Sequence, residues 1–398
     1  MAIPFADRLN NVETSAIREL FKLLGKPGII SFAGGFPDSA MFDVDGIREA
    51  SNAALTEDPG AALQYGATEG FTPLREQLSR FMAHKGAKDV AADQLIVTTG
   101  SQQALDLLGK TLIGPGDKVI VEGPTFLATI QCFRLYGADL VSAPIDGEGV
   151  QTDQLEQLMA EHKPKFVYLI PTFGNPSGGL LSLERRKRVL ELAVKYNTII
   201  VEDDPYGDLY FGEAPPPSLL ALTAQIPGSR ELLVHCGSLS KVLSPGLRVG
   251  WMIAPPELLA KATMCKQFSD AHTSTFTQAT AAQYLKAGRM PATLEKVRSV
   301  YARRARTMGD ALRRELGDAF TFVQPQGGLF VWGRLTGAGG KVADGHVFAQ
   351  RAIEQGVAFV PGAPFFCAQP DQASLRLSFA TAGEDKILEG VSRLARAL

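Results

Sequence analysis

The feature that most constrains the fold is a series of short, almost continuously apolar runs that alternate with amphipathic stretches. The runs occupy residues 94–99, 118–122, 166–170, 198–201 and 232–236. Helical patterns occupy residues 101–112, about 125–135 and the stretch from about 182. Apolar strands separated by helices are typical of a parallel sheet that is buried on both faces. The sequence therefore predicts an α/β fold, in which helices flank a large, mostly parallel central sheet.

The pattern changes near residue 290, where a long charged helix is expected over residues 294–316. Shorter strand signals follow at 320–323, 328–332 and 374–379 and predict a smaller α+β domain. The first 40 residues show no strand signal, and we expect them to pack beside the C-terminal part. The predicted division is an N-terminal helix and arm over residues 1–44, a large α/β domain over 45–288 and a small α+β domain over 289–398.

The composition excludes several classes of protein. With 45% hydrophobic residues and a net charge of −2, the chain resembles neither a disordered protein nor a basic nucleic-acid binder. No apolar run approaches the roughly 18 residues of a membrane span, and the N-terminus has no secretory pattern. The four cysteines and five histidines show no spacing typical of a disulfide framework or a metal site. We expect a cytoplasmic enzyme that binds neither nucleic acid nor a membrane.

The loops after the predicted strands are candidate binding sites, because open α/β sheets bind ligands at the carboxyl ends of their strands. Ser101 and Gln102 begin a helix, and free N–H groups at a helix start suit a phosphate. A plain helix cap is the alternative. Asn175 lies in a Gly-Asn-Pro turn, where its amide either faces a ligand or only shapes the turn.

Three carboxylates, Glu202, Asp203 and Asp204, stand at the end of the fourth apolar run, and Tyr206 follows. Burying a carboxylate is costly unless it meets a cation. Since no histidine spacing indicates a metal, a cationic organic ligand is the expected partner. A solvated loop is the alternative.

The segment 237–248 is the most informative part of the chain. Lys241 lies among small hydroxyl residues directly after a strand, and Arg248 follows seven residues later. Two hydroxyl groups and an arginine can hold a phosphate dianion. A second cation near Lys241 would lower its pKa and give a reactive amine. An exposed basic turn is the alternative.

In their order along the chain, these motifs resemble the class I and II aminotransferases, enzymes of fold type I that use pyridoxal 5′-phosphate (PLP). The resemblance extends from residues 17–20 to residues 375–378 and is strongest to the subgroup of 2-aminoadipate and kynurenine aminotransferases. The segments that carry it are residues 31–35, 63–66, 68–70, 99–106, 202–206 and 237–241. It implies that the large domain binds PLP.

The resemblance also implies roles at the cofactor. Lys241 would bind PLP covalently as the internal aldimine and later move the proton of the substrate. Asp203 would pair with the pyridine nitrogen, while Tyr206 and Asn175 would contact the ring oxygen O3′. The phosphate would be held by Ser101, Gln102, Ser238, Ser240 and Arg248.

Further residues are expected at the substrate. Arg376 would bind the substrate α-carboxylate as a bidentate fork, although an outward-facing charge is the alternative in an alternating strand. Gly34 and Gly35 would let the backbone approach the substrate closely. Arg18 would meet a distal carboxylate. Tyr65 would reach the phosphate of the neighbouring subunit, which implies a homodimer with shared active sites.

One position departs from the family pattern, since Phe126 stands where a tyrosine is usual. A phenylalanine can still stack on the pyridine face, and the role of the missing hydroxyl stays open. Asn175 and Tyr65 are expected to contact the substrate as well as the cofactor.

We therefore expect an aminotransferase of amino-acid metabolism that moves the amine of an L-amino acid to a 2-oxo acid, 2-oxoglutarate, by a ping-pong mechanism. The expected donors are 2-aminoadipate, branched-chain and aromatic amino acids. One alternative is another PLP reaction on the same fold, a β-lyase or decarboxylase, and Arg376 disfavours decarboxylation. The other is a PLP-binding regulator, whose winged-helix domain would precede a first helix that is expected here near Thr14.

Overall fold

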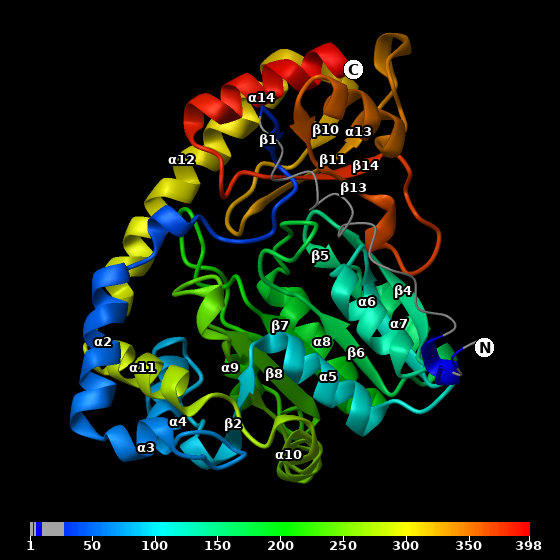
Figure 1. Ribbon diagram of the computed structural model, residues 1–398. Helices are drawn as coiled ribbons and strands as arrows, with labels where there is room; N and C mark the ends of the chain where they lie inside the picture. The colour runs from blue at the N-terminus through cyan, green and yellow to red at the C-terminus, as the bar shows by residue number, and fades with distance from the viewer. Residues whose placement is uncertain (1–2, 4, 10–27) are drawn as a thin grey trace.

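The computed structural model describes residue 3, residues 5–9 and residues 28–398. Its centre is an eight-stranded sheet in the order β2-β9-β8-β7-β6-β3-β4-β5 (Figure 1). The strands are β2 (Leu95–Thr99), β3 (Lys118–Gly123), β4 (Asp139–Asp146), β5 (Gly149–Val150), β6 (Phe166–Leu169), β7 (Ile199–Asp204), β8 (Leu233–Ser238) and β9 (Val249–Ile253). Strands β5 and β9 run antiparallel to their neighbours, and the other strands share one direction.

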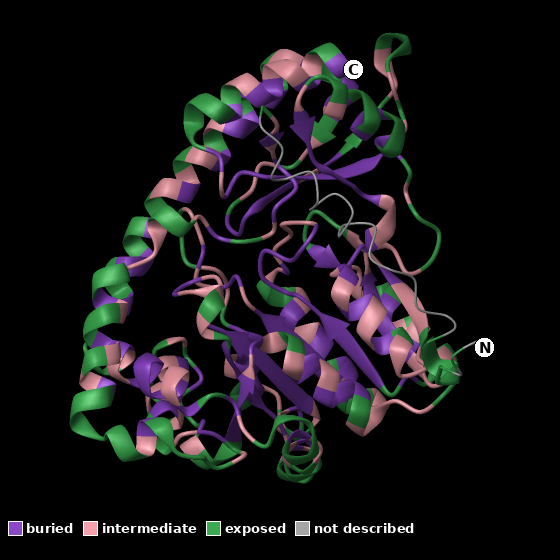
Figure 2. Ribbon diagram, viewed as in Figure 1, coloured by how far each residue is buried: buried purple, intermediate pink, exposed green. Residues whose placement is uncertain are grey.

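Helices cover both faces of this sheet, as its apolar strands require. Side chains of α5, α6 and α10 join one core cluster with Val121 and Val201, whereas the next strand positions, Ile120 and Ile200, face a second cluster. Figure 2 shows the strands buried between partly exposed helices. The helices of this part are α2 (Val44–Glu57), α3 (Pro59–Leu63), α4 (Thr72–His84), α5 (Ser101–Leu112), α6 (Leu127–Leu135), α7 (Thr152–His162), α8 (Leu183–Tyr196), α9 (Leu219–Leu222), α10 (Pro256–Asp270) and α11 (Thr275–Lys286).

A smaller antiparallel sheet has the order β10-β11-β14-β13. Its strands are β10 (Phe320–Phe322), β11 (Phe330–Leu335), β13 (Val360–Pro361) and β14 (Ser374–Ser378), and its helices are α12 (Met290–Leu316), α13 (Gly345–Glu354) and α14 (Glu384–Ala397). The long helix α12, yellow in Figure 1, runs from α11 to the small sheet and packs against α14 there. The predicted fold class is therefore confirmed, while the domain boundaries at residues 44 and 288 stay predictions.

Several elements differ from the sequence-based expectation. Strands β4 and β9 were not predicted: β4 is only partly buried and contains Pro144, and β9 contains Gly250, so neither gives a clean apolar run. The prediction of no strand in the first 40 residues is wrong, because β1 (Ile30–Ser31) pairs in parallel with β12 (Val357–Ala358). Two residues are too few for a periodic signal.

The helix expected near Thr14 lies outside the described residues. In the part of the chain that the structure describes, no helix is both long and apolar enough to span a membrane.

Candidate active site

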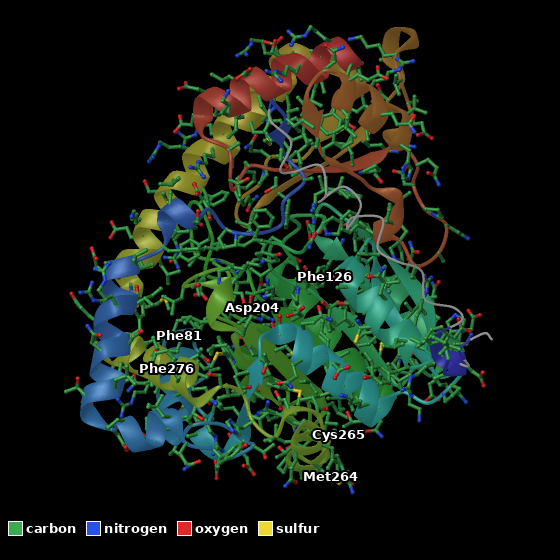
Figure 3. The ribbon with its side chains drawn as sticks, viewed as in Figure 1. Phe81, Phe126, Asp204, Met264, Cys265 and Phe276 are labelled. Carbon is green, nitrogen blue, oxygen red and sulfur yellow. The ribbon has the colours of Figure 1, made fainter. Side chains whose placement is uncertain are left out.

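A cavity of about 390 Å³ opens at the carboxyl ends of β6, β7 and β8, where the large sheet faces the smaller one. Figure 3 labels Phe126, which lines this cavity, and Asp204 of β7, whose side chain lies on the opposite side of that strand. The sequence-predicted residues that line it are Gly35, Ser101, Gln102, Phe126, Asn175, Asp203, Tyr206, Ser238, Ser240, Lys241, Arg248 and Arg376. Loops from five strands and the N-terminal segment thus meet where the topology places the strand ends.

Lys241 points its amine into this cavity from the loop after β8. Its Nζ donates a hydrogen bond to the carbonyl oxygen of Gly35 over 2.9 Å. Burial, with the nearby guanidinium groups of Arg376 and Arg248, lowers the pKa of Lys241 to about 8. A large fraction of the amine is therefore neutral near that pH, as a nucleophile or proton acceptor must be.

The alternation of side chains along β7 separates the three carboxylates. Asp203 faces the cavity, whereas Glu202 and Asp204 point to the opposite side of the strand. Glu202 accepts hydrogen bonds from the backbone N–H groups of Leu219 and Leu220 and contacts His235 Nδ1. The Asp204 carboxylate forms an ion pair with Lys85. All three are buried, so the solvated loop is excluded.

Asp203 carries the most informative unpaired atom of the site. Its Oδ2 accepts a hydrogen bond from the Tyr168 hydroxyl at 2.7 Å, and its Oδ1 is buried without a partner among the described residues. Burial raises the pKa of Asp203 to about 6, although the Tyr168 hydrogen bond acts in the opposite direction. A cationic N–H group in the cavity would satisfy Oδ1 and favour the ionised carboxylate.

An anion-binding wall forms where the start of α5 meets the loop after β8. Ser101 and Gln102 open the helix, whose first N–H groups have no intrahelical acceptors. The hydroxyl of Ser238 donates to that of Ser240 over 2.9 Å. The Arg248 guanidinium donates to the Thr99 carbonyl oxygen over 3.1 Å, which holds it beside the helix start. A guanidinium, two hydroxyls and a helix N-terminus together suit a phosphate dianion.

Gly100 lets this wall form. Its φ is +74°, and a Cβ at this position would lie 2.4 Å from Arg248 Nη2. A larger residue would be strained in the backbone and would push the guanidinium away.

Arg376 is buried in β14, so the alternative of an outward-facing charge is excluded. Its Nη1 donates to Asn175 Oδ1 over 2.7 Å and its Nη2 to the Ala33 carbonyl oxygen over 2.8 Å. The guanidinium lies over the rings of Phe330 and Phe365, and its buried Nε has no partner among the described residues. Burial lowers the pKa of Arg376 to about 10, so it stays a cation at neutral pH.

Three more predicted residues line other parts of the cavity. A Cβ on Gly35 would lie 3.7 Å from Arg376 Nη1, an ordinary van der Waals distance, so the backbone here passes close beside the guanidinium. Tyr206 is buried edge-on against Phe330, and burial raises the pKa of its hydroxyl. Phe126, labelled in Figure 3, lines the cavity from the start of α6.

Two predicted residues lie outside the cavity, and the position of a third is not described. Gly34 packs against the Phe36 ring and is not part of the cavity lining. The Tyr65 side chain is 86% exposed and packs edge-on against His272, outside the cavity of its own chain. Arg18 lies outside the described residues.

Sequence reasoning missed other residues of the site. The cavity is also lined by Phe36, Leu127, Ala128, Gln131, Ile170, Pro205, Pro245 and Phe365. Apart from Gln131, these are apolar residues or prolines, which look the same as core or turn residues in a sequence. Tyr168 was also missed, although a hydroxyl in the otherwise apolar run 166–170 was a usable signal.

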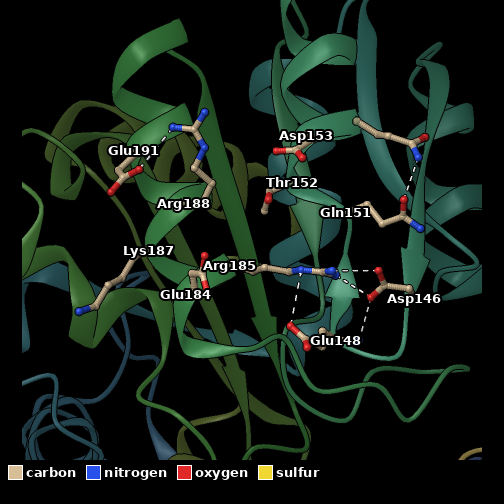
Figure 4. A pocket seen from close by; sticks show the side chains of 11 residues that line it. Asp146, Glu148, Gln151, Thr152, Asp153, Glu184, Arg185, Lys187, Arg188 and Glu191 are labelled. Carbon is tan, nitrogen blue, oxygen red and sulfur yellow. Dashed lines mark hydrogen bonds and ion pairs between the residues drawn. The ribbon is translucent and has the colours of Figure 1, made fainter.

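Two other hollows do not resemble active sites. One, of about 740 Å³, is lined by charged side chains that pair with one another, such as Arg185 with Asp146 and Arg188 with Glu191 (Figure 4). Another lies behind β7, where Lys85 bridges Asp204 and Asp208. Within residues 28–398 and the described N-terminal positions, no cluster of three or more His, Cys, Asp or Glu side chains could hold a metal ion.

Comparison with known proteins identifies the family. The family model for aminotransferase class I and II matches residues 28–394. The chain belongs to this family. It is 43% identical to the 2-aminoadipate transaminase of Thermus thermophilus over 99% of this chain and 96% of that protein. It is 38% identical to aromatic-amino-acid aminotransferase 1 of Thermococcus litoralis over 99% and 94% of the two chains.

A solved aminotransferase structure superimposes on this chain along nearly its whole length. It is LysN, an α-aminoadipate aminotransferase from Thermus thermophilus complexed with N-(5′-phosphopyridoxyl)-L-leucine. The TM-score is 0.90 at 41% identity, and the match covers 99% of this chain and 97% of that one. The protein is thus a PLP-dependent aminotransferase of fold type I.

The residues of the cavity fit PLP. The partnerless Asp203 Oδ1 is a buried acceptor suited to a ring N–H, and the Lys241 amine has the lowered pKa that a covalent attachment needs. The wall of Ser238, Ser240 and Arg248 beside the start of α5 suits the phosphate.

Proposed function

We propose that this aminotransferase moves the amine of an L-amino acid to 2-oxoglutarate in a ping-pong reaction, with 2-aminoadipate, branched-chain or aromatic amino acids as donors. One observation carries the proposal: a lysine of lowered pKa and a buried arginine line the same 390 Å³ cavity. Transamination requires that the α-carboxylate of the amino acid be held while its Cα–H bond is broken. Arg376 can hold the carboxylate, and Lys241 can accept the proton.

Arg376 would bind the substrate. Its two terminal nitrogens now donate to Asn175 and Ala33, and its Nε has no partner among the described residues. A carboxylate that approaches the fork would form charge-assisted hydrogen bonds with a guanidinium already held in place. This arrangement keeps the carboxylate on the substrate and favours cleavage of the Cα–H bond.

Lys241 would move the proton. Since its pKa is lowered to about 8, the amine can accept the Cα proton and return it within the same site. The carbonyl of Gly35, 2.9 Å from Nζ, supplies an acceptor that orients the amine while it carries a proton.

When bound, PLP would supply the electron sink for the Cα–H electrons. Asp203 would hold the ring nitrogen, Phe126 would cover the ring face, and Tyr206 with Asn175 would contact the ring oxygen. The phosphate would lie on Ser101, Gln102, Ser238, Ser240 and Arg248, all of which line the cavity.

The proposed donors follow from relatives and from the lining. The relatives at 43% and 38% identity are named for 2-aminoadipate and for aromatic amino acids. Phe36, Leu127, Ala128 and Phe365 add apolar surface, which suits aliphatic and aromatic side chains. Arg18 stays the proposed partner of a distal carboxylate.

We also propose a cytoplasmic homodimer in which Tyr65 serves the neighbouring site. The ring of Tyr65 is 86% exposed, and Leu63 nearby is 71% exposed, so both present apolar surface that a second subunit would cover. The Thr275 hydroxyl donates to the Gln64 carbonyl oxygen and fixes this segment against α11.

The first experiment is the visible absorption spectrum of the purified PLP-bound protein during addition of single L-amino acids. With an accepted donor, the PLP band should shift to the pyridoxamine form and return on addition of 2-oxoglutarate. A panel of 2-aminoadipate, leucine, phenylalanine, kynurenine and glutamate would rank the donors. A band that persists with every donor, or that changes without return, would contradict transamination and favour a regulator or a lyase.

The shared site is tested by mixing two inactive variants, Tyr65→Ala and Lys241→Ala. If Tyr65 serves the neighbouring subunit, a mixed dimer contains one intact site, and random mixing should restore about one quarter of wild-type activity. If Tyr65 acts in its own subunit, mixing restores none.

A further inference from the structure

Tyr168 is a buried hydroxyl that the proposed reaction does not use. It lies on β6 beside Asp203 of β7, and Tyr168 pairs with Val201 in the parallel register, so Tyr168 and Asp203 share one face of the sheet. The side chain is fully buried, and its ring packs edge-on against Phe133 of α6 at 5.8 Å. Packing explains the ring, but it does not explain the hydroxyl.

The hydroxyl has one acceptor, the Oδ2 atom of Asp203, at 2.7 Å. The other oxygen of that carboxylate, Oδ1, is buried without a partner among the described residues. A carboxylate with one oxygen fixed can present only the other to the cavity. Burial and the adjacent Asp203 charge raise the pKa of Tyr168 well above its ordinary value, so the phenol keeps its proton and stays a donor.

We propose that Tyr168 is a positioning residue for the cofactor: its hydroxyl holds Asp203 Oδ2 and thereby directs Oδ1, in the ionised form, at the ring nitrogen of PLP. The proposal rests on the function proposed above, in which Asp203 is the partner of that nitrogen. Tyr168 does not line the cavity, so it acts through Asp203.

Other groups around Asp203 do not replace this hydroxyl. The groups that act on the ionisation of Asp203 are Tyr168, Asp204, His235 and Glu202. Tyr206 and Cys236 lie near enough for the Asp203 charge to raise their pKa values. Glu202 and Asp204 are held on the opposite side of β7 by their own donors, including His235 and Lys85. Among the described residues, Tyr168 is thus the one side chain that donates a hydrogen bond to Asp203.

The test compares Tyr168→Phe with Tyr284→Phe. Both variants remove only a buried hydroxyl, and Tyr284 also donates to a carboxylate, Asp43, over 3.0 Å, on segments that do not line the cavity. The first measurement uses protein freed of PLP: infrared difference spectra against Asp203→Asn give the pKa of the Asp203 carboxyl. We expect this pKa to rise above that of wild type in Tyr168→Phe and to stay unchanged in Tyr284→Phe.

The second measurement is the dissociation constant of PLP at pH 8, titrated into the same cofactor-free proteins. Tyr168→Phe should weaken binding by up to about tenfold, because the hydrogen bond to Asp203 already exists in the cofactor-free protein and only the part of its strength gained with bound PLP affects affinity. The loss should grow as the pH falls toward 6, because a protonated Asp203 cannot hold a ring N–H. Either unchanged PLP affinity or an unchanged Asp203 pKa in Tyr168→Phe would overturn the proposal.

The variant Asp203→Asn distinguishes the role of Asp203 at the ring nitrogen from the role of Tyr168 at Asp203. If Asp203→Asn weakens PLP binding and Tyr168→Phe does not, Asp203 keeps its proposed role and Tyr168 loses its own. If Asp203→Asn binds PLP as tightly as wild type, both fail. Should Tyr168→Phe not fold, 3-fluorotyrosine at position 168 gives the opposite test: a stronger donor should lower the Asp203 pKa, and no change would overturn the proposal.

Discussion

The Lys241 amine and the Gly35 carbonyl oxygen lie 2.9 Å apart, which joins the loop after β8 to the N-terminal segment. The two residues are separated by 206 positions in the chain, so this contact depends on the completed fold. It holds the reactive amine in the buried site, where burial first, and then the charges of Arg376 and Arg248, lower its pKa.

Capture of PLP by the cofactor-free protein should depend on pH through Lys241. The amine is neutral above its pKa of about 8, so the capture rate should rise between pH 6 and pH 9 with a midpoint near 8. Stopped-flow absorbance gives the rate. Lys241→Ala, the control, should show neither covalent capture nor transamination. A midpoint near 10.5, the ordinary lysine value, would show that the site does not perturb this amine.

Asp203→Asn should stabilise the cofactor-free fold while it lowers kcat. Burial raises the pKa of Asp203 from 3.8 to about 6, so the ionised carboxylate destabilises the folded state. The free energy of unfolding falls as the pH rises between these two values and stays at the lower level above them. Asparagine removes this cost, which is about 3 kcal/mol at pH 8. Denaturant titrations at pH 4 and pH 8 would check this, because the gain should vanish at the lower pH.

Asp204→Asn is the matched control, with the opposite sign. Burial alone would raise the pKa of Asp204, but Lys85 outweighs this and lowers it. The ion pair therefore contributes stability above about pH 4 that is lost as the pH falls through the lowered pKa. Asp204→Asn should destabilise at pH 8. Equal effects of the two substitutions would contradict the different environments of the two carboxylates.

Arg376→Ala should weaken the binding of every amino-acid donor. Truncating one member of a buried charged pair costs about a hundredfold or more in affinity, so KM should rise by that factor for monocarboxylic and dicarboxylic donors alike. Steady-state kinetics with leucine and 2-aminoadipate would show it. If only the dicarboxylic donor were affected, the α-carboxylate would bind to another arginine.

Gly100→Ala should weaken binding of the cofactor phosphate. The new Cβ would lie 2.4 Å from Arg248 Nη2, so the guanidinium must move. Affinity for PLP should fall about tenfold or more, while affinity for pyridoxal, which lacks the phosphate, should change little.

Gly288→Ala is the control for backbone strain, because Gly288 has a φ of +69° and its Cβ would meet nothing within 4 Å. Equal losses of PLP affinity in the two variants would show that backbone strain, and not the clash with Arg248, causes the effect.

The strands and the loops that follow them were predictable because a strand buried on both faces of the sheet appears in the sequence as a continuous apolar run. The apolar runs became β2, β3, β6, β7 and β8, and the polar residues after them line one cavity. The resemblance to aminotransferases then assigned roles that spacing alone left open between a ligand site and a turn.

What could not be predicted depends on contacts between distant segments. An alternating strand normally turns its charge outward, yet Arg376 is buried because Ala33, 343 residues away, and Asn175 accept its hydrogen bonds. The rings of Phe330 and Phe365 beside it are ordinary core residues in the sequence. Likewise, nothing local marks β9 as the antiparallel neighbour of β8.

The segment 33–35 is held at two points, since Ala33 accepts from Arg376 of the small sheet and Gly35 accepts from Lys241 of the large domain. A lysine nitrogen that is covalently engaged can no longer serve Gly35 as a free ammonium donor. Loading the enzyme would therefore free one of these two attachments, while the backbone bond from Phe32 to Ala358 still anchors the segment to the small sheet. The exchange rate of amide hydrogens in residues 34–36 would then show whether the cofactor is bound to Lys241, without any measurement of the reaction itself.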